Sequence, residues 1–223
     1  MARVQEKRFK IIPEMEGRQA RWYAAQRRSG GQMAAYRARA RELAAGLPPG
    51  AAVLEVAPGP GYLAAELARL GLSVTAVDVS RTMVEIATEH ARGEGVAVDV
   101  RQGDVADLAL QSSSFDLVVC QAAFKNFTEP VRALDEMHRV LRPGGTAVIE
   151  DMSADATTAD IATEVAGMSL SRGNALVTRS VLRFLRRRAH GRARFEELAA
   201  RSRFGEASIT TRGIGITVTL TKR

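Results

Sequence analysis

An apolar strand that leads into a glycine turn and then a helix is the feature that most constrains how this chain can fold. Residues 53–56 are apolar apart from Glu55, and Gly59 and Gly61 follow closely. Residues 62–70 place apolar side chains at helical spacing. Glycine permits positive φ and lets a ligand lie against bare backbone, while the helix start presents unpaired N–H groups. This order of elements predicts a doubly wound α/β sheet with a ligand site at the turn.

The chemistry of the turn separates two classes of ligand. Gly59-x-Gly61-x-x-Ala64 fits the fingerprint of dinucleotide-binding proteins, which is a weak signal when it stands alone. A pyrophosphate needs N–H donors and positive potential, but Pro58 and Pro60 have no N–H, and Glu55 ends the strand with a carboxylate. A cationic ligand without phosphate suits the turn better, and S-adenosylmethionine (SAM), with a sulfonium and an ammonium group, is such a ligand. A tight turn that binds no ligand is the alternative.

The same residues resemble motif I of the class I SAM-dependent methyltransferases, in which an acidic residue precedes a G-x-G-x-G turn. Glu55 takes the acidic place, Gly59 and Gly61 take the last two glycines, and Ala57 stands where the family has the first. Residues 115–151, with Leu-Arg-Pro-Gly-Gly at 141–145, look most like the small-molecule branch that includes the ubiquinone and menaquinone methyltransferases. The resemblance covers residues 50–151. It implies a seven-stranded Rossmann-like sheet of order 3-2-1-4-5-7-6, with the last strand antiparallel, and a helical insertion after strand 5.

Asp78 ends the second predicted strand, nineteen residues after Gly59. A carboxylate at this point accepts two hydrogen bonds from a ribose diol, and the resemblance implies the same role. In the family, an acidic residue at the place of Asp104 accepts a hydrogen bond from the adenine amino group, and the next N–H meets a ring nitrogen; Asp107 is a weaker alternative. The residues expected to bind the cofactor are Glu55, Ala57, Gly59, Gly61, Asp78, Val79, Met83, Asp104, Val105 and Gln121.

The acceptor pocket is expected where the fourth and fifth strands end, because ligands bind at the carboxyl edge of such sheets. Phe124, Lys125 and Asn126 follow the fourth strand, and Asp151 ends the fifth, where it is a candidate base. In the family, helices upstream of motif I often cover the cofactor, so Tyr23 is a candidate lid residue; packing against the core is its alternative. No catalytic residue is assigned beyond this pocket, since a base is optional when the acceptor is acidic or a neutral amine.

The chain divides into residues 1–46, an arm followed by lid helices at 15–28 and 32–46, and residues 47–223, the SAM-binding methyltransferase domain. Within this domain, residues 155–203 read as a helical cap with helices at about 156–170, 174–187 and 192–202. Residues 207–212 and 214–221 alternate around Gly213 as an antiparallel hairpin.

The net charge of +7 is concentrated at the N-terminus, because residues 1–41 hold eleven basic and three acidic residues, a balance of +8. The chain has one cysteine, no metal-ligand motif, no secretory h-region and no apolar run near the length of a membrane span, so we expect a cytoplasmic protein. The function expected is SAM-dependent methyl transfer to an O, N or C nucleophile of a small molecule. The alternatives are an RNA methyltransferase that uses the basic arm and the Arg183–Arg194 cluster, and a SAM-binding protein that transfers nothing.

Overall fold

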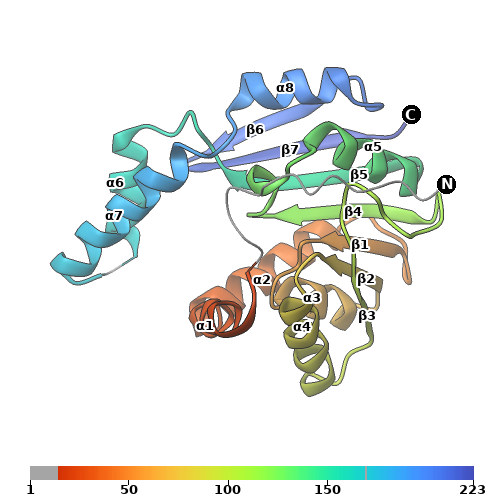
Figure 1. Cartoon of the computed structure of the whole chain (residues 1–223), viewed down its shortest axis with the longest axis horizontal. Helices are drawn as coiled ribbons and strands as arrows, with labels where there is room; N and C mark the ends of the chain where they lie inside the picture. The colour runs from red at the N-terminus through yellow and green to blue at the C-terminus, as the bar shows by residue number, and fades with distance from the viewer. Residues whose placement is uncertain (1–14, 169) are drawn as a thin grey trace.

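A computed structural model describes residues 15–168 and 170–223 and is built around one mixed seven-stranded sheet (Figure 1). The strand order is β3-β2-β1-β4-β5-β7-β6, and β7 runs antiparallel to both of its neighbours. The predicted sheet is therefore confirmed, including its antiparallel last strand. The strands are β1 (Ala52–Val56), β2 (Ser73–Asp78), β3 (Val98–Gln102), β4 (Phe115–Gln121), β5 (Leu141–Met152), β6 (Ser208–Arg212) and β7 (Gly215–Thr221).

Helices cover both faces of this sheet, and two apolar clusters hold them there. One cluster joins the sheet to α2 and α3, and the other joins it to α5 and α8. Strand β1 lies between the two clusters and pairs with β2 and β4, which explains its nearly continuous apolar sequence. The helices are α1 (Gly17–Gln26), α2 (Gly30–Ala44), α3 (Tyr62–Arg69), α4 (Arg81–Gly93), α5 (Pro130–Val140), α6 (Thr158–Gly167), α7 (Arg172–Arg186) and α8 (Arg192–Arg201), with a 3-10 turn η1 (Phe124–Asn126).

The segment 141–145 belongs to β5, although it contains a proline and two glycines. Leu141 pairs with Phe115, and the register then shifts before Thr146 pairs with Leu117. Arg142 in this segment forms an ion pair with Asp116, whose carboxylate also accepts the N–H of Ala52. Asp116 thus ties three strands together at the end of the sheet opposite the carboxyl edge.

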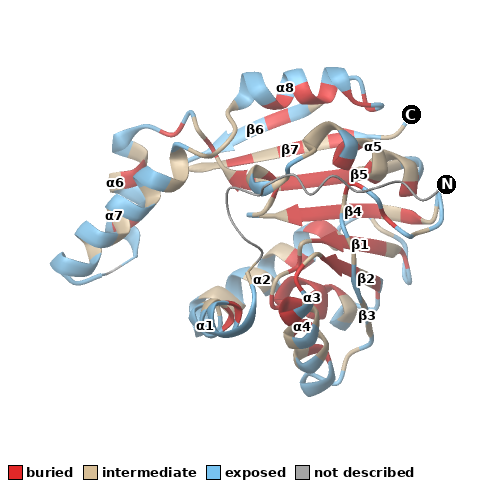
Figure 2. Ribbon diagram, in the orientation of Figure 1, coloured by how far each residue is buried: buried red, intermediate tan, exposed pale blue. Residues whose placement is uncertain are grey.

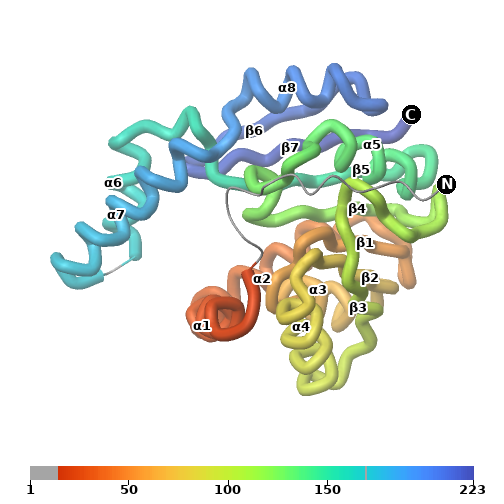
Figure 3. Tube along the Cα trace, in the orientation of Figure 1, coloured from red at the N-terminus to blue at the C-terminus, as the bar shows by residue number. Residues whose placement is uncertain are grey.

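The N-terminal and insertion helices occur close to their predicted places, but they differ in how they are packed. Helix α1 contacts α4, and α2 contacts α3, while the arm predicted for residues 1–13 lies outside the described residues. Helices α6 and α7 form a hairpin that projects beyond the sheet (Figures 1 and 3). No residue of α7 is buried, and its ribbon is mostly exposed in Figure 2.

Candidate functional site

A cleft of about 750 Å³ opens at the carboxyl ends of β1, β2, β4 and β5. Its volume lies within the usual range for small-molecule sites. Residues of α1, α2 and α7 also contribute to its walls, so the cleft lies between the sheet edge and two helical covers. Eleven predicted site residues line it: Tyr23, Glu55, Ala57, Gly59, Asp78, Val79, Met83, Gln121, Lys125, Asn126 and Asp151.

The turn after β1 takes the left-handed backbone that its glycines favour. Gly59 has φ 55° and lies at the cleft, where an added Cβ would come no closer than 4.0 Å to the ring of Tyr23. Gly61 has φ 76°, and an added Cβ would lie 2.8 Å from the Cβ of Ala87 in α4. Gly61 is therefore needed for packing between helices, and it is not among the residues that line the cleft.

Ala57 keeps the backbone of the glycine that it replaces. Its φ is 53°, in the left-handed region that costs a non-glycine residue about 1 kcal/mol or more. Ala122, directly after β4, has φ 55° and lines the same cleft. Two strained alanines thus follow the two central strands at the edge where the cleft opens, a placement typical of binding sites.

Glu55 is buried at the end of β1, with 3% of its surface exposed. Burial raises the pKa of its carboxyl group to about 8, and the nearby charge of Asp78 adds to this rise, while the N–H of Ala64 opposes it. Its Oε2 atom is buried without a hydrogen-bond partner, although the residue lines the cleft. A buried polar atom without a partner is costly, so this oxygen is suited to a donor or cation supplied by a ligand.

Asp78 ends β2 and joins two backbone segments at the cleft. Its Oδ2 accepts the N–H of Gly59 at 3.1 Å, and its Oδ1 accepts the N–H of Ser80 at 2.9 Å. The cap of α4 is Ser80, whose Oγ accepts the N–H of Met83, so Asp78 does not serve as the helix cap. The carboxylate lies at the cleft wall, where the sequence predicts ribose recognition.

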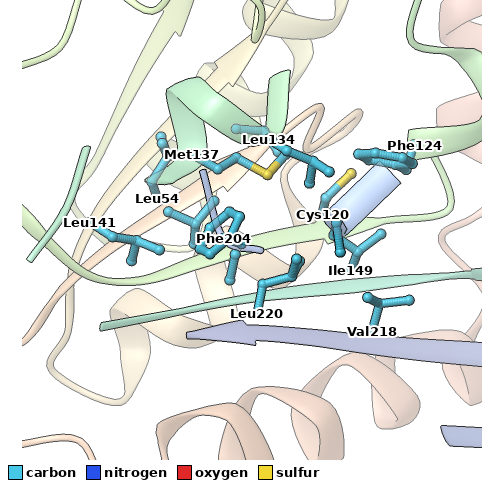
Figure 4. Packing of buried hydrophobic residues seen from close by; sticks show 14 of the residues in the cluster. Leu54, Cys120, Phe124, Leu134, Met137, Leu141, Ile149, Phe204, Val218 and Leu220 are labelled. Carbon is cyan, nitrogen blue, oxygen red and sulfur yellow. The ribbon is translucent and has the colours of Figure 1, made fainter. Parts of the chain in front are cut away.

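Four predicted residues lie away from the cleft wall: Gly61, Asp104, Val105 and Phe124. Asp104 is exposed and accepts the N–H of Ala106, an Asx-type turn bond. Val105 packs against the core. Phe124 is fully buried among Phe127, Phe195 and His190, and it lies beside the core residues in Figure 4, so the structure corrects its predicted place in the acceptor pocket. The apolar side of the short η1 helix faces the core, and Lys125 and Asn126 face the cleft.

Lys125 and Asp151 form a nearly buried ion pair in the wall of the cleft. Their side chains are 11% and 2% exposed, and Nζ lies 2.7 Å from Oδ1. Nζ also donates to the carbonyl of Ala122, while the carboxylate accepts the N–H groups of Lys125 and Met152. Asp151 is therefore occupied as an acceptor by three donors, which makes it a weak candidate for a base.

A second network links α2 to the ends of β4 and β5. Arg39 donates from Nε and Nη2 to the two carboxylate oxygens of Glu150, and Gln121 donates to the same carboxylate at 2.6 Å. Arg39 also reaches Glu42 on its own helix. Sequence reasoning did not identify Arg39, because the arginine lies 111 residues from its partner and nothing local marks it as a cleft residue.

Helix α1 is fixed at the entrance by polar contacts at both of its ends. Glu16 accepts the N–H groups of Arg81 and Thr82 at the start of α4, and Tyr62 donates to the carbonyl of Ala24. Tyr23 accepts a hydrogen bond from Arg27 at the cleft. Further cleft residues that no sequence pattern marks come from the two helical covers and their ends: Met15, Arg27, Tyr36, Leu182, Leu185 and Arg188.

Comparison with known proteins agrees with this geometry. Residues 54–149 match the family model described as "Methyltransferase domain". The matched range runs from within β1 to within β5 and so includes most of the strands whose ends form the cleft. This match identifies residues 54–149 as a methyltransferase domain. The strand order of the sheet is that of the Rossmann-like methyltransferase fold.

Individual relatives cover the chain to different extents. The ubiquinone biosynthesis O-methyltransferase of Xanthomonas campestris is 38% identical over 106 residues, which is 47% of this chain and 44% of the relative. The chain thus aligns with less than half of the length of this curated relative. A SAM-dependent methyltransferase from Aquifex aeolicus has a TM-score of 0.68 over 91% of this chain and 98% of its own, at 16% identity, which shows the shared fold.

A second similar structure carries a different name. The [4+2]-cyclase SpnF is 30% identical, with a TM-score of 0.53 over 58% of this chain and 50% of its own. The same domain is thus similar both to methyltransferases and to a cyclase. The family alone does not determine the reaction, which has to be argued from the site.

Proposed function

We propose that this chain transfers the methyl group of SAM to an O, N or C nucleophile of a small molecule by in-line displacement. The observation that carries the proposal is the buried, unpartnered Oε2 of Glu55 beside the left-handed glycine turn at the cleft. A carboxyl group in this position accepts donors from a cationic ligand and opposes a phosphate. SAM carries an ammonium and a sulfonium, which fits such a site.

The half of the cleft formed by the ends of β1 and β2, which we call the β1–β2 half, would hold the cofactor. Glu55 would accept from the amino group, Gly59 would allow the close approach of the backbone, and Asp78 would bind the ribose diol. Val79 and Met83 would flank the adenine with apolar surface, and both line the cleft. When bound, SAM supplies an activated methyl group, so the protein needs no nucleophile of its own.

The half formed by the ends of β4 and β5, the β4–β5 half, would position the acceptor. Lys125 and Asn126 line the cleft here, and so do Leu182 and Leu185 of α7. Their task would be to orient the nucleophile toward the methyl group and exclude water, which supplies about 7–11 kcal/mol of rate enhancement in well-oriented reactions. Because Asp151 already accepts three hydrogen bonds, we propose an acceptor that needs no strong base.

The test combines a binding and a product measurement. Calorimetry with SAM should show one site, and Glu55→Leu, which fills similar space without accepting a hydrogen bond, should weaken binding by at least tenfold. Incubation of SAM with phenols, catechols and amines should form S-adenosylhomocysteine with some acceptors. Binding without S-adenosylhomocysteine formation across that range would instead favour a protein that uses the cleft without methyl transfer, an outcome given weight by the similarity to the cyclase.

Two further parts of this proposal concern partners and location. We propose a small molecule as the acceptor, since curated relatives such as the one from Xanthomonas campestris are named ubiquinone biosynthesis O-methyltransferases. In the described part of the chain, no helix combines the length and apolarity that crossing a bilayer requires. A cytoplasmic location stays part of the proposal and is tested by cell fractionation.

A further inference from the structure

Helix α7 carries an apolar face that no other part of the described chain covers. Leu176, Val177, Val181 and Phe184 are 65%, 64%, 50% and 58% exposed, although they lie on one side of the helix at helical spacing. Met168 and Leu170, just before the helix, are exposed as well. Monomeric proteins rarely expose apolar side chains gathered in this way unless the surface binds something.

The opposite side of α7 already faces the cleft and the base of the hairpin. Leu182 and Leu185 line the cleft, and Arg186, just after them, donates to the carbonyl of Ala156 at the base of the hairpin. The helix therefore has a packed side that holds it in place and an apolar side that faces away. The hairpin projects from the body in Figure 1, and Figure 2 colours most of α7 as exposed.

The charge of this region indicates what kind of partner it would meet. Residues 165–195 contain eight arginines and no Asp or Glu: Arg172, Arg179, Arg183, Arg186, Arg187, Arg188, Arg192 and Arg194. Arg172, Arg183 and Arg187 are exposed and, at about 100° per residue, follow one edge of the apolar face. Arginine stems can lie along an apolar surface while the guanidinium groups reach outward.

We infer that α7 docks on an anionic lipid surface, with Leu176, Val177, Val181 and Phe184 inserted at the headgroup boundary and the neighbouring arginines bound to lipid phosphates. An amphipathic helix with a basic flank and bulky apolar residues has the form of an interfacial helix. A second copy of this chain fits less well, because two such faces would bring their arginine rows together. Nucleic acid also fits less well, because three of the four exposed apolar side chains are aliphatic and cannot stack on bases in the way aromatic rings do.

The test uses the full chain and sedimentation with vesicles, and it does not depend on methyl transfer. The wild type should bind vesicles of phosphatidylcholine mixed with phosphatidylglycerol, bind phosphatidylcholine alone much more weakly, and lose binding as salt is raised. Val181→Ser with Phe184→Ser should weaken binding by at least tenfold. Arg183→Gln with Arg187→Gln should weaken it by roughly fivefold for each arginine removed.

A matched control changes similar residues elsewhere. Leu70→Ser with Arg92→Gln replaces an exposed apolar residue and an exposed arginine near α3 and α4, and it should bind vesicles like the wild type. Equal binding by the wild type and the Val181/Phe184 variant would overturn the inference. So would a dimer in light scattering that this variant separates, or RNA binding that needs the arginines but not the apolar residues.

Discussion

The two halves of the cleft satisfy their buried charges in different ways. In the β1–β2 half, Asp78 accepts two backbone N–H groups, and Glu55 keeps a buried oxygen without a partner. In the β4–β5 half, Asp151 is paired with Lys125, and Glu150 is paired with Arg39 and Gln121. The first half thus leaves an acceptor atom for a ligand, whereas the second has acidic groups that are already bound by side chains.

This difference suggests how selectivity is divided between the halves. A ligand of the β1–β2 half gains hydrogen bonds that the protein alone does not make, which favours a defined cofactor. An acceptor in the β4–β5 half would have to compete with existing ion pairs for polar contacts. Its recognition would therefore depend more on apolar wall residues of the cleft, such as Leu182 and Leu185.

The largest effect should follow from breaking the ion pair of the β4–β5 half. Lys125→Met leaves the carboxylate of Asp151 buried without its ammonium partner, and losing one member of a buried pair costs about 3–5 kcal/mol. Urea unfolding measures this loss. Combining Lys125→Met with Asp151→Asn should recover most of it. A single variant as stable as the wild type would mean that the pair does not hold this half together.

The β1–β2 half should respond to pH through Glu55. The raised pKa of about 8, against an ordinary value of 4.5, means that the folded protein retains a proton that the unfolded chain loses in this window. The free energy of unfolding should therefore fall as pH rises from 5 to 8, by about 3 kcal/mol in total. Glu55→Gln should remove this slope, as measured by urea unfolding at several pH values. Saturating SAM should reduce the slope in the wild type, since an adjacent cation favours the ionised carboxylate.

An intermediate effect is expected for Asp78. Asp78→Ala should weaken SAM binding by about 1.5–3 kcal/mol, the range for hydrogen bonds to a charged group. Because its oxygens also hold the N–H groups of Gly59 and Ser80, stability should be measured beside calorimetry. Asp78→Asn keeps an acceptor for one of these groups and serves as the control. Unchanged affinity in both variants would show that Asp78 does not bind the ribose.

How much the sequence could predict depends on whether a feature is marked by neighbouring residues or formed by residues far apart in the chain. Local patterns within residues 53–78 predict the glycine turn and the place of Asp78, and the family resemblance of residues 50–151 implies the sheet order; the structure has all three. The contact of Arg39 with Glu150 joins residues 111 positions apart, so no local pattern reveals it. Phe124 was placed in the pocket because it follows a strand, but the following short helix turns this ring into the core and Lys125 toward the cleft.

The smallest effect compares the two strained alanines, one in each half. Ala57→Gly and Ala122→Gly should each stabilise the protein by about 0.5–1 kcal/mol, because glycine relieves the left-handed strain at φ 53° and 55° but loses more backbone entropy on folding. Thermal unfolding measures this gain. Only Ala57→Gly should also change the affinity for SAM in calorimetry, since its methyl group lies in the turn proposed to approach the cofactor. An equal change from Ala122→Gly would indicate that the cofactor contacts both strand ends, and the assignment of the β4–β5 half to the acceptor would then be wrong.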